Sequence, residues 1–369
     1  MKIHCSKADL SRGVQTIQSA LSSRTPLPNL LNFLIETEDS KLKLVSTDLE
    51  MGVKHYIPAE IETGGSITIP AKKFSDIIHT LQDEHDIDLT VEPGGKVQLK
   101  SGRSRFSIIG APKSEYPVLP EFNQTGSFSI KATTLEEMVR KTLIAASSDE
   151  SRHALNGCFW VGHEGNLEMV ATDGRRLAII KRACLPKDKE FRVIVPTKIL
   201  TELLRLLSQE KAGEEDQVQA GVTDNQIAFQ YKTTTLLSRL VEGSFPNYEQ
   251  VIPVKKDLQV QLDTKAFVQI TKRASLCASD RGGSVKFTLR SGALHVYASS
   301  PNLEFDDELA VDYKGAEFAV AFNPQFILDG LKAFDCDKVM LSLTAPVNPA
   351  LFEPLGETDY KYVVMPMRV

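Results

Sequence analysis

The sequence predicts an α+β fold made of three copies of one unit, and three recurring features lead to this prediction. A short alternating segment followed by an amphipathic helix occurs three times in the 369 residues. Each time, a strand with a turn-like pair follows, and then a strand that runs into a second helix. Since the features recur in order at a spacing of about 126 residues, the repeat has the size of a domain and not of a solenoid unit.

The first helix of each copy is predicted from the spacing of its apolar residues. The three segments are residues 3–21, 128–146 and 260–278. The stripe of the first copy consists of Leu10, Val14, Ile17 and Leu21, and that of the third consists of Phe267, Ile270, Ala274 and Cys277. Residues at this spacing share one face of a helix, so each helix should pack with that face on a sheet.

The strands and second helices follow at matching positions. Asp48, Asp173 and Ser300 occupy the turn-like pairs and lie 125 and 127 residues apart. Pro70, Pro196 and Asn323 precede the second helices and lie 126 and 127 residues apart. Strands that alternate between apolar and polar residues, with helices between them, indicate antiparallel sheets with helices on one face.

Two short segments interrupt the periodicity and set the predicted domain boundaries. Pro, Asn and Gly are frequent in residues 121–127 and 246–257. Such residues mark turns and linkers. We therefore predict domains at residues 1–125, 126–253 and 254–369.

Composition limits the class of protein. Apolar residues make up 42% of the chain and charged residues 25%, which excludes disordered, collagenous and coiled-coil proteins. No apolar run is long enough to cross a bilayer, and the N-terminus has no signal-peptide core. The five cysteines form no CxxC pair. We expect reduced thiols and a cytoplasmic protein without a membrane partner.

The net charge restricts how the chain can contact nucleic acid. Its formal value is −5, with a pI near 5.9. Binding nucleic acid over the whole surface requires a basic footprint. Any contact with DNA must therefore use a locally basic face.

Two motifs allow both a structural and a functional interpretation. The segment ATDGRRLAI (residues 171–179) fits a hairpin with Asp173 and Gly174 in its turn. The C-terminus, YKYVVMPMRV (residues 360–369), remains apolar to its end, as expected of a strand against a sheet or of a surface that receives a partner. Methionines such as Met365 and Met367 suit a surface that admits several ligands.

The sequence contains no pattern that indicates catalysis. Its seven histidines show no metal-ligand spacing, and no GxSxG, Walker loop or GxGxxG stands in the required context. We predict no catalytic residue, no metal site and no cofactor.

The chain resembles the bacterial sliding-clamp family, the beta subunits of DNA polymerase III. The similarity covers the whole length and includes ATDGRRLA in the second copy, FPNYEQVIP before the third and YVVMPMRV at the end. The resemblance implies a non-catalytic processivity factor: a head-to-tail homodimer whose helices line a ring around double-stranded DNA, with antiparallel sheets outside. Implied partners are the replicative DNA polymerase, the clamp loader and other clamp-motif proteins.

The family also implies three sets of site residues. A pocket for partner peptides would be formed by Leu155, Thr172, Gly174, Arg175, Arg176, Leu177, Pro246, Val251, Asn323, Phe326, Val347, Pro349, Val363, Met365, Pro366, Met367 and Arg368. DNA would be contacted by Arg24, Arg152, Lys198, Arg281 and Lys286. The dimer interface would contain Lys73, Arg103, Arg105, Phe106, Ile108, Leu276, Cys277, Glu304, Asp306, Asp307 and Glu308.

Three positions depart from the family pattern, and two other functions compete with the clamp. Arg175, Gln250 and Val369 replace a histidine, an arginine and a leucine that are common there. We expect the pocket to persist with an altered peptide preference. A saddle protein that bends DNA would have a basic chain with apolar wedges, which the net charge disfavours. A cytoplasmic hydrolase on a repeated scaffold would show activity on esters or phosphates.

Overall fold

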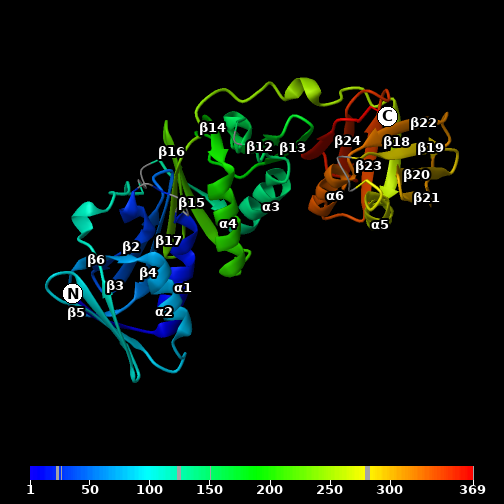
Figure 1. The fold of residues 1–369 in the computed structure, drawn as a ribbon. Helices are drawn as coiled ribbons and strands as arrows, with labels where there is room; N and C mark the ends of the chain where they lie inside the picture. The colour runs from blue at the N-terminus through cyan, green and yellow to red at the C-terminus, as the bar shows by residue number, and fades with distance from the viewer. Residues whose placement is uncertain (22–24, 26, 123–125, 150, 279–282, 369) are drawn as a thin grey trace. The chain divides into compact units, whose positions relative to one another are not determined.

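The computed structural model describes residues 1–369 except 22–24, 26, 123–125, 150, 279–282 and 369 (Figure 1). It divides into two compact units. Unit 1 comprises Met1–Ala132 and Thr201–Leu240, and unit 2 comprises Thr133–Leu200 and Val241–Val369.

The described residues form six α-helices, two for each predicted repeat. They are α1 (Lys7–Ile17), α2 (Ala71–Thr80), α3 (Ala132–Leu143), α4 (Thr197–Gln209), α5 (Thr264–Ser275) and α6 (Pro324–Ala333). Ser6 caps α1, since its Oγ accepts a hydrogen bond from the Asp9 backbone N–H at 3.0 Å. The helices α1 and α2 lie against each other, as do α5 and α6. The predicted stripe residues within α1 and α5 are buried. Leu21 instead lies beyond the end of α1 and is half-buried, since α1 ends at Ile17 and a 3-10 turn follows, while Cys277 is buried just after α5.

Unit 1 contains two antiparallel sheets, in the orders β5-β1-β7-β8-β9 and β10-β15-β16-β17-β4-β3-β2-β6. The strands are β1 (Lys2–Cys5), β2 (Asn32–Glu38), β3 (Lys41–Thr47), β4 (Met51–Pro58), β5 (Glu60–Thr63), β6 (Ser66–Pro70), β7 (Ile87–Val91), β8 (Lys96–Ser101), β9 (Ser104–Ile109), β10 (Phe128–Lys131), β15 (Gln217–Val222), β16 (Gln226–Tyr231) and β17 (Thr234–Arg239).

Unit 2 also contains two antiparallel sheets, in the orders β14-β11-β12-β13-β25-β24-β23-β18 and β21-β20-β19-β22. The strands are β11 (Gly157–His163), β12 (Asn166–Thr172), β13 (Arg176–Arg182), β14 (Phe191–Pro196), β18 (Leu258–Asp263), β19 (Val285–Arg290), β20 (Ala293–Ser300), β21 (Leu303–Ala310), β22 (Phe318–Phe322), β23 (Lys338–Leu343), β24 (Ala350–Pro354) and β25 (Tyr360–Val364). The predicted α+β class, with antiparallel sheets, is confirmed.

The two eight-stranded sheets explain why the chain forms two units although the sequence shows three repeats. In unit 1, β4 of the first repeat pairs with β17 of the second, with Leu236 opposite Val53. In unit 2, β13 of the second repeat pairs with β25 of the third, with Leu177 opposite Val363. Continuous backbone ladders therefore join each half of the second repeat to a neighbouring repeat.

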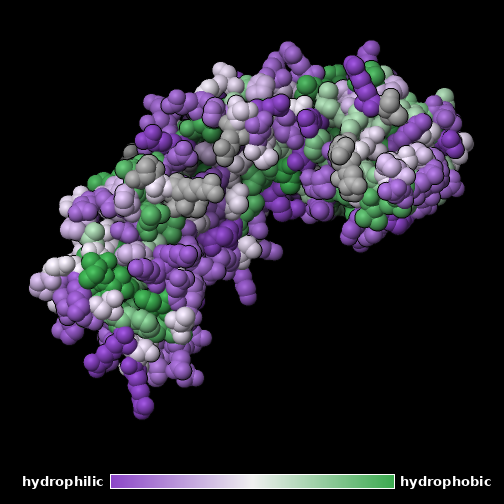
Figure 2. Space-filling model, in the orientation of Figure 1, coloured by the Kyte–Doolittle hydropathy of each residue, from purple (hydrophilic) through white to green (hydrophobic). Residues whose placement is uncertain are grey.

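Hydrophobic surface is limited on the visible face of the molecule. Figure 2 shows mostly hydrophilic residues there, with hydrophobic residues in separate patches. Among the large apolar side chains, Val118 is 93% exposed, Ile109 69% and Leu276 67%. Single exposed apolar residues are common, but those that line a hollow or a sheet edge indicate contact sites.

A buried histidine couples the stability of unit 1 to pH. His55 in β4 is 5% exposed, and its Nδ1 lies 2.8 Å from Thr234 Oγ1 on β17. Burial lowers the pKa of His55 from 6.5 to about 4. Between these values the unfolded chain binds a proton that the folded chain does not bind. The free energy of unfolding is therefore not reduced through His55 above about pH 6.5, and it falls as the pH decreases toward 4.

Acidification from about pH 7 to about pH 5 is expected to cost roughly 2 kcal/mol of folding free energy through His55. Urea unfolding followed by circular dichroism at both pH values measures this loss, and His55→Gln should reduce it. His79→Gln, at an exposed position on α2, is the matched control. An equal pH dependence in the wild type and His55→Gln would contradict the assignment.

Candidate peptide-binding site

The turn between β12 and β13 is built by hydrogen bonds of two side chains. Asp173 Oδ1 accepts from the backbone N–H groups of Arg175 and Arg176, at 2.8 and 3.0 Å. Thr172 Oγ1 accepts from the Gly174 N–H at 3.0 Å and donates to the Arg176 carbonyl at 2.6 Å. Gly174 has φ 83°, in the left-handed region that glycine adopts without strain. The predicted hairpin is thus confirmed.

A cavity of about 160 Å³ lies beside this turn within unit 2. Its lining comes from the residues just before β11, the β12–β13 turn, the segment between β17 and β18, and the end of β25. The lining residues are Leu155, Thr172, Gly174, Arg176, Leu177, Pro246, Asn247, Tyr248, Val251, Val363 and Met365. A small, mostly apolar hollow with a few polar groups can receive one apolar side chain and orient the attached backbone.

A buried apolar cluster supports the floor of this cavity. It contains Val170, Leu177, Leu351 and Val363, with Phe159, Phe245 and Tyr248 packed against it. The Phe159 and Phe245 rings stack with centroids 5.0 Å apart. Tyr248 donates its hydroxyl to Glu168, and burial together with this carboxylate raises the pKa of that hydroxyl. The floor is therefore fixed on several strands and on the linker before β18.

Arg176 is held in place by two carboxylates and a ring. Its Nη1 lies 2.7 Å from Asp329 Oδ2, and its Nε lies 3.1 Å from Asp173 Oδ2. The guanidinium carbon lies 4.6 Å from the centre of the Phe326 ring. Since its charge is already paired, Arg176 contributes mainly the flat face of its guanidinium and its side-chain carbons to the cavity wall.

The C-terminal segment connects this cavity with a second hollow of unit 2. The Met365 N–H donates to the Arg175 carbonyl, and the Met367 N–H donates to the Ala321 carbonyl, both at 2.8 Å. The second hollow has about 680 Å³ and is lined by Lys286, Ala319, Val320, Ala321, Pro346, Val347, Pro366, Met367 and Arg368. The alternating backbone bonds place Met365 in one hollow and Met367 in the other.

The structure places the predicted peptide-pocket residues in three groups. Nine line the smaller cavity: Leu155, Thr172, Gly174, Arg176, Leu177, Pro246, Val251, Val363 and Met365. Four line the larger hollow: Val347, Pro366, Met367 and Arg368. The remaining four, Arg175, Asn323, Phe326 and Pro349, line neither hollow. Asn323 caps α6 by accepting from the Gln325 N–H at 2.9 Å, while Phe326 packs on Arg176.

Sequence reasoning missed Asn247 and Tyr248 as lining residues. Both stand in the FPNYEQVIP segment, which the sequence indicates as a domain linker and as a family motif. An aromatic residue next to a Pro-Asn pair in an otherwise polar linker was the available signal. It points to a linker that packs on a surface instead of spanning open solvent.

The predicted DNA-contact residues occupy different settings. Arg24 and Arg281 lie outside the described residues. Arg152 is exposed and donates from Nη1 to the Asp173 carbonyl at 3.0 Å, so it lies beside the peptide cavity. Lys198 is an exposed residue in the first turn of α4. Lys286, on β19, lines the larger hollow of unit 2.

Several basic residues on the helices have carboxylate partners. Arg140 pairs with Asp335, Lys141 Nζ lies 2.6 Å from Glu137 Oε1, and Arg273 Nη2 lies 2.7 Å from Asp307 Oδ2. These partners reduce the charge available for phosphate contacts.

The predicted dimer residues lie on two sheet edges and at nearby helices. The strands β9 and β21 are edge strands of their sheets. Leu276 is exposed, while Ile108 and Cys277 are 7% and 5% exposed, so these two can support a contact only from beneath. Ile109, the neighbour of Ile108 on β9, is 69% exposed and was not among the predicted residues. Asp306 and Asp307 pair with His295 and Arg273, whereas Glu304 and Glu308 are exposed. Lys73, Arg103 and Arg105 are also exposed, and Phe106 is half-buried.

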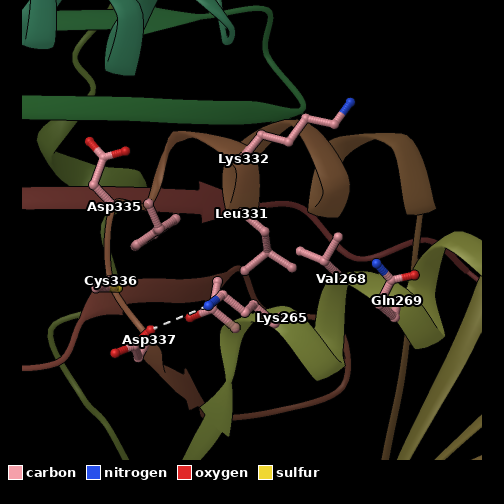
Figure 3. A pocket seen from close by; sticks show the side chains of 10 residues that line it. Lys265, Val268, Gln269, Leu331, Lys332, Asp335, Cys336 and Asp337 are labelled. Atoms are coloured by element: carbon pink, nitrogen blue, oxygen red, sulfur yellow. Dashed lines mark ion pairs between the residues drawn. The ribbon is translucent and has the colours of Figure 1, made fainter.

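A further hollow of about 530 Å³ lies between α5 and α6 (Figure 3). Lys265 Nζ lies 4.0 Å from Asp337 Oδ1, and Lys332 and Asp335 add one charge of each sign. Asp335 also pairs with Arg140 from α3.

Membrane-spanning helices and metal-binding clusters are both absent from the described residues. No helix in the described part of the chain is long and apolar enough to span a membrane. No group of three or more His, Cys, Asp or Glu side chains within the described ranges is arranged to hold a metal ion.

Comparisons with known proteins identify one family along the whole chain. The family models for the N-terminal, central and C-terminal domains of the DNA polymerase III beta subunit match residues 1–120, 129–247 and 249–368. The beta sliding clamp of Haemophilus influenzae is 33% identical over 371 residues, covering 100% of both chains.

Solved structures show the same similarity. A sliding clamp from Bacillus subtilis matches with a TM-score of 0.95 at 28% identity, covering 100% of this chain and 99% of that chain. A Pseudomonas aeruginosa clamp bound to griselimycin matches with a TM-score of 0.93 at 31% identity, covering 100% of both. With three consecutive family matches and full-length similarity in sequence and fold, the chain belongs to the bacterial beta sliding clamps, the non-catalytic processivity subunits of DNA polymerase III.

Proposed function

We propose that the chain forms a head-to-tail homodimeric ring that encloses double-stranded DNA in the bacterial cytoplasm. Each chain would contribute three clamp domains, at residues 1–125, 126–253 and 254–369, with helices toward the DNA and sheets outside. Two edge strands, β9 and β21, support the closure, since unpaired edges offer backbone groups to another chain. The net charge of −5 suits a protein held on DNA by topology, with only weak contacts from Arg24, Arg152, Lys198, Arg281 and Lys286.

The peptide cavity of unit 2 would connect the ring to its enzymes. The observation that supports this role best is the convergence of nine predicted residues on one apolar cavity beside a rigid turn. The replicative DNA polymerase, the clamp loader and other clamp-motif proteins would each insert a short segment with a leucine or phenylalanine. The larger hollow, with Met367 and Arg368, would accept the flanking part of the segment.

Retention on DNA tests the ring. After loading onto closed circular duplex, the protein is expected to remain bound in salt that removes ordinary electrostatic binders, and to leave when the circle is cut. Gel filtration of the DNA-bound fraction measures retention before and after cleavage. Equal retention on linear and circular DNA would refute the ring. Light scattering of the free protein should give about twice 40.8 kDa.

A further inference from the structure

Unit 1 contains a hollow at the position that corresponds to the peptide cavity of unit 2. It has about 280 Å³ and lies where β3, β4 and β17 meet the segment after β9. Its lining residues are Thr47, Leu49, Glu50, Met51, Gly52, Pro117, Val118, Leu119, Pro120, Gln226, Leu237, Ser238 and Arg239.

The turn beside this hollow repeats the hydrogen bonds of the unit 2 turn. Asp48 Oδ1 accepts from the backbone N–H groups of Glu50 and Met51, at 3.0 and 2.8 Å. Thr47 Oγ1 accepts from the Leu49 N–H at 3.0 Å and donates to the Met51 carbonyl at 2.8 Å. Residues 47–51 therefore correspond one to one to residues 172–176 in the peptide cavity.

The strand pairing extends this correspondence to the opposite wall. Gly52 pairs with Leu237 in unit 1, as Leu177 pairs with Val363 in unit 2. Leu237 therefore stands where Val363 stands, and Arg239, two residues later, stands at the position of Met365. Both hollows thus have the same backbone frame, formed by a tight turn and the end of a strand from the next repeat.

Leu119 replaces the wall that Leu177 provides in unit 2. A Cβ atom at Gly52 would lie 2.7 Å from the Leu119 Cδ1 atom, so the glycine allows the linker side chain to lie directly on the strand. Leu119 also packs on the buried cluster of Leu34, Val45 and Tyr116. An apolar wall is therefore retained, although it comes from a different segment.

Leu49 adopts a backbone conformation that is unfavourable for leucine. Its φ is 78°, close to the 83° of the corresponding Gly174, and its side chain is 46% exposed. A side chain with a Cβ is strained in this region, and such strain is concentrated at functional positions. The turn therefore presents an apolar side chain at the edge of the hollow where glycine would suit the backbone better.

The two hollows differ in the pairing of their arginines, and the unit 1 lining also contains the exposed Glu50. Arg176 in unit 2 is paired with Asp173 and Asp329. Arg239 in unit 1 is exposed, and no described residue forms an ion pair with its guanidinium. Its backbone N–H donates to the Glu50 carbonyl at 3.0 Å, and its carbonyl accepts from Ser238 Oγ at 2.9 Å. An acidic group on a ligand can therefore pair with Arg239 without displacing a carboxylate of the protein.

We propose that the unit 1 hollow is a second peptide-binding site, for an extended peptide that inserts a leucine or phenylalanine and places a carboxylate near Arg239. The proposal rests on the proposed function, because it assigns to unit 1 the type of ligand assigned to unit 2. It adds a distinct preference, since acidic peptides bind more tightly here than their neutral analogues. One chain then holds two peptides at once.

Methyl NMR of the full-length protein labelled at methionine separates the two sites. Met51 lines the unit 1 hollow and Met365 lines the unit 2 cavity. The substitutions Met51→Leu and Met365→Leu assign the two signals. The probes are the peptides Gln-Leu-Asp-Leu-Phe and Gln-Leu-Asn-Leu-Phe, both with amidated C-termini so that the aspartate supplies the only carboxylate.

Titration with the aspartate peptide should shift both methyl signals to saturation. The Met51 signal reports on the unit 1 hollow. There, the asparagine peptide is expected to bind about tenfold more weakly than the aspartate peptide, which corresponds to the loss of one charge-assisted hydrogen bond. Arg239→Gln should remove this difference, while Lys41→Gln, at the far end of β3, should preserve it. Leu49→Gly should retain or raise stability and still weaken binding at Met51, which a purely structural role of Leu49 would not produce.

The outcomes distinguish this proposal from the proposed function. A saturable shift at Met365 without one at Met51 overturns the second site and supports the unit 2 cavity. A shift at Met51 that is equal for both peptides overturns the role of Arg239. Absence of any shift at Met365 counts against the peptide cavity of unit 2 itself.

Discussion

The variant Leu276→Asp is expected to fold normally and to sediment as a monomer of 40.8 kDa at low micromolar concentration. Leu276 follows α5 and is 67% exposed in the single chain, so a carboxylate there remains hydrated until the chains associate. In the proposed dimer this carboxylate would be buried without a partner, at a cost of several kcal/mol. Analytical ultracentrifugation measures the change in mass.

A matched control separates the interface from general effects of an added charge. Val254 is also apolar, lies in unit 2 and is 93% exposed, but it stands in the segment before β18 and outside the predicted interface residues. Val254→Asp should therefore remain dimeric. If Leu276→Asp stays dimeric at the same concentration, the interface has been placed incorrectly, whatever the behaviour of the control.

The variant Met365→Ala is expected to bind a partner peptide about thirtyfold more weakly, equivalent to about 2 kcal/mol, while remaining a folded dimer. Met365 lines the unit 2 cavity and is 37% exposed, so its side chain contributes more to the cavity wall than to the core. Fluorescence anisotropy with a labelled peptide of the type Gln-Leu-x-Leu-Phe measures the affinity.

Met365 is a better position for this test than Leu177 because its side chain is less buried. Leu177 lines the same cavity but is 1% exposed and belongs to the apolar cluster, so Leu177→Asp would also reduce stability. Met340→Ala removes the same side chain from a half-buried position on β23 outside the cavity, and it should leave the affinity unchanged. Unchanged affinity in folded Met365→Ala would remove this cavity from the proposed function.

The sequence predicted the fold well because each repeat shows the regular spacing of apolar residues that is typical of its helices and strands. Apart from Leu21 and Cys277, which lie just beyond the ends of α1 and α5, the apolar stripes and the strands around Asp173 appear where residue spacing placed them. The pairing of β4 with β17, and of β13 with β25, was not predictable in the same way. Which strand edges meet depends on contacts between residues more than a hundred positions apart, and each edge alone shows only an alternating pattern.

The site was predicted in part, and mainly through family resemblance. Residue types alone gave a hairpin at Asp173 and an apolar C-terminus, without indicating that the two come together. Their meeting requires β25 to pair with β13, so that Met365 reaches the Arg175 carbonyl. Met365 and Met367 lie in two different hollows because their backbone N–H groups donate to different carbonyls, those of Arg175 and Ala321. Neither composition nor residue spacing in the sequence predicts this separation.

The position of the only tryptophan makes the protein's fluorescence report on one part of the chain. Trp160 lies in β11, within unit 2, and is fully buried. Its emission will therefore change when the core of unit 2 opens, whereas unfolding confined to unit 1 should leave the emission wavelength unchanged. Circular dichroism detects strands in both units. A denaturation curve that begins earlier by dichroism than by emission would identify an equilibrium intermediate in which unit 1 has unfolded first.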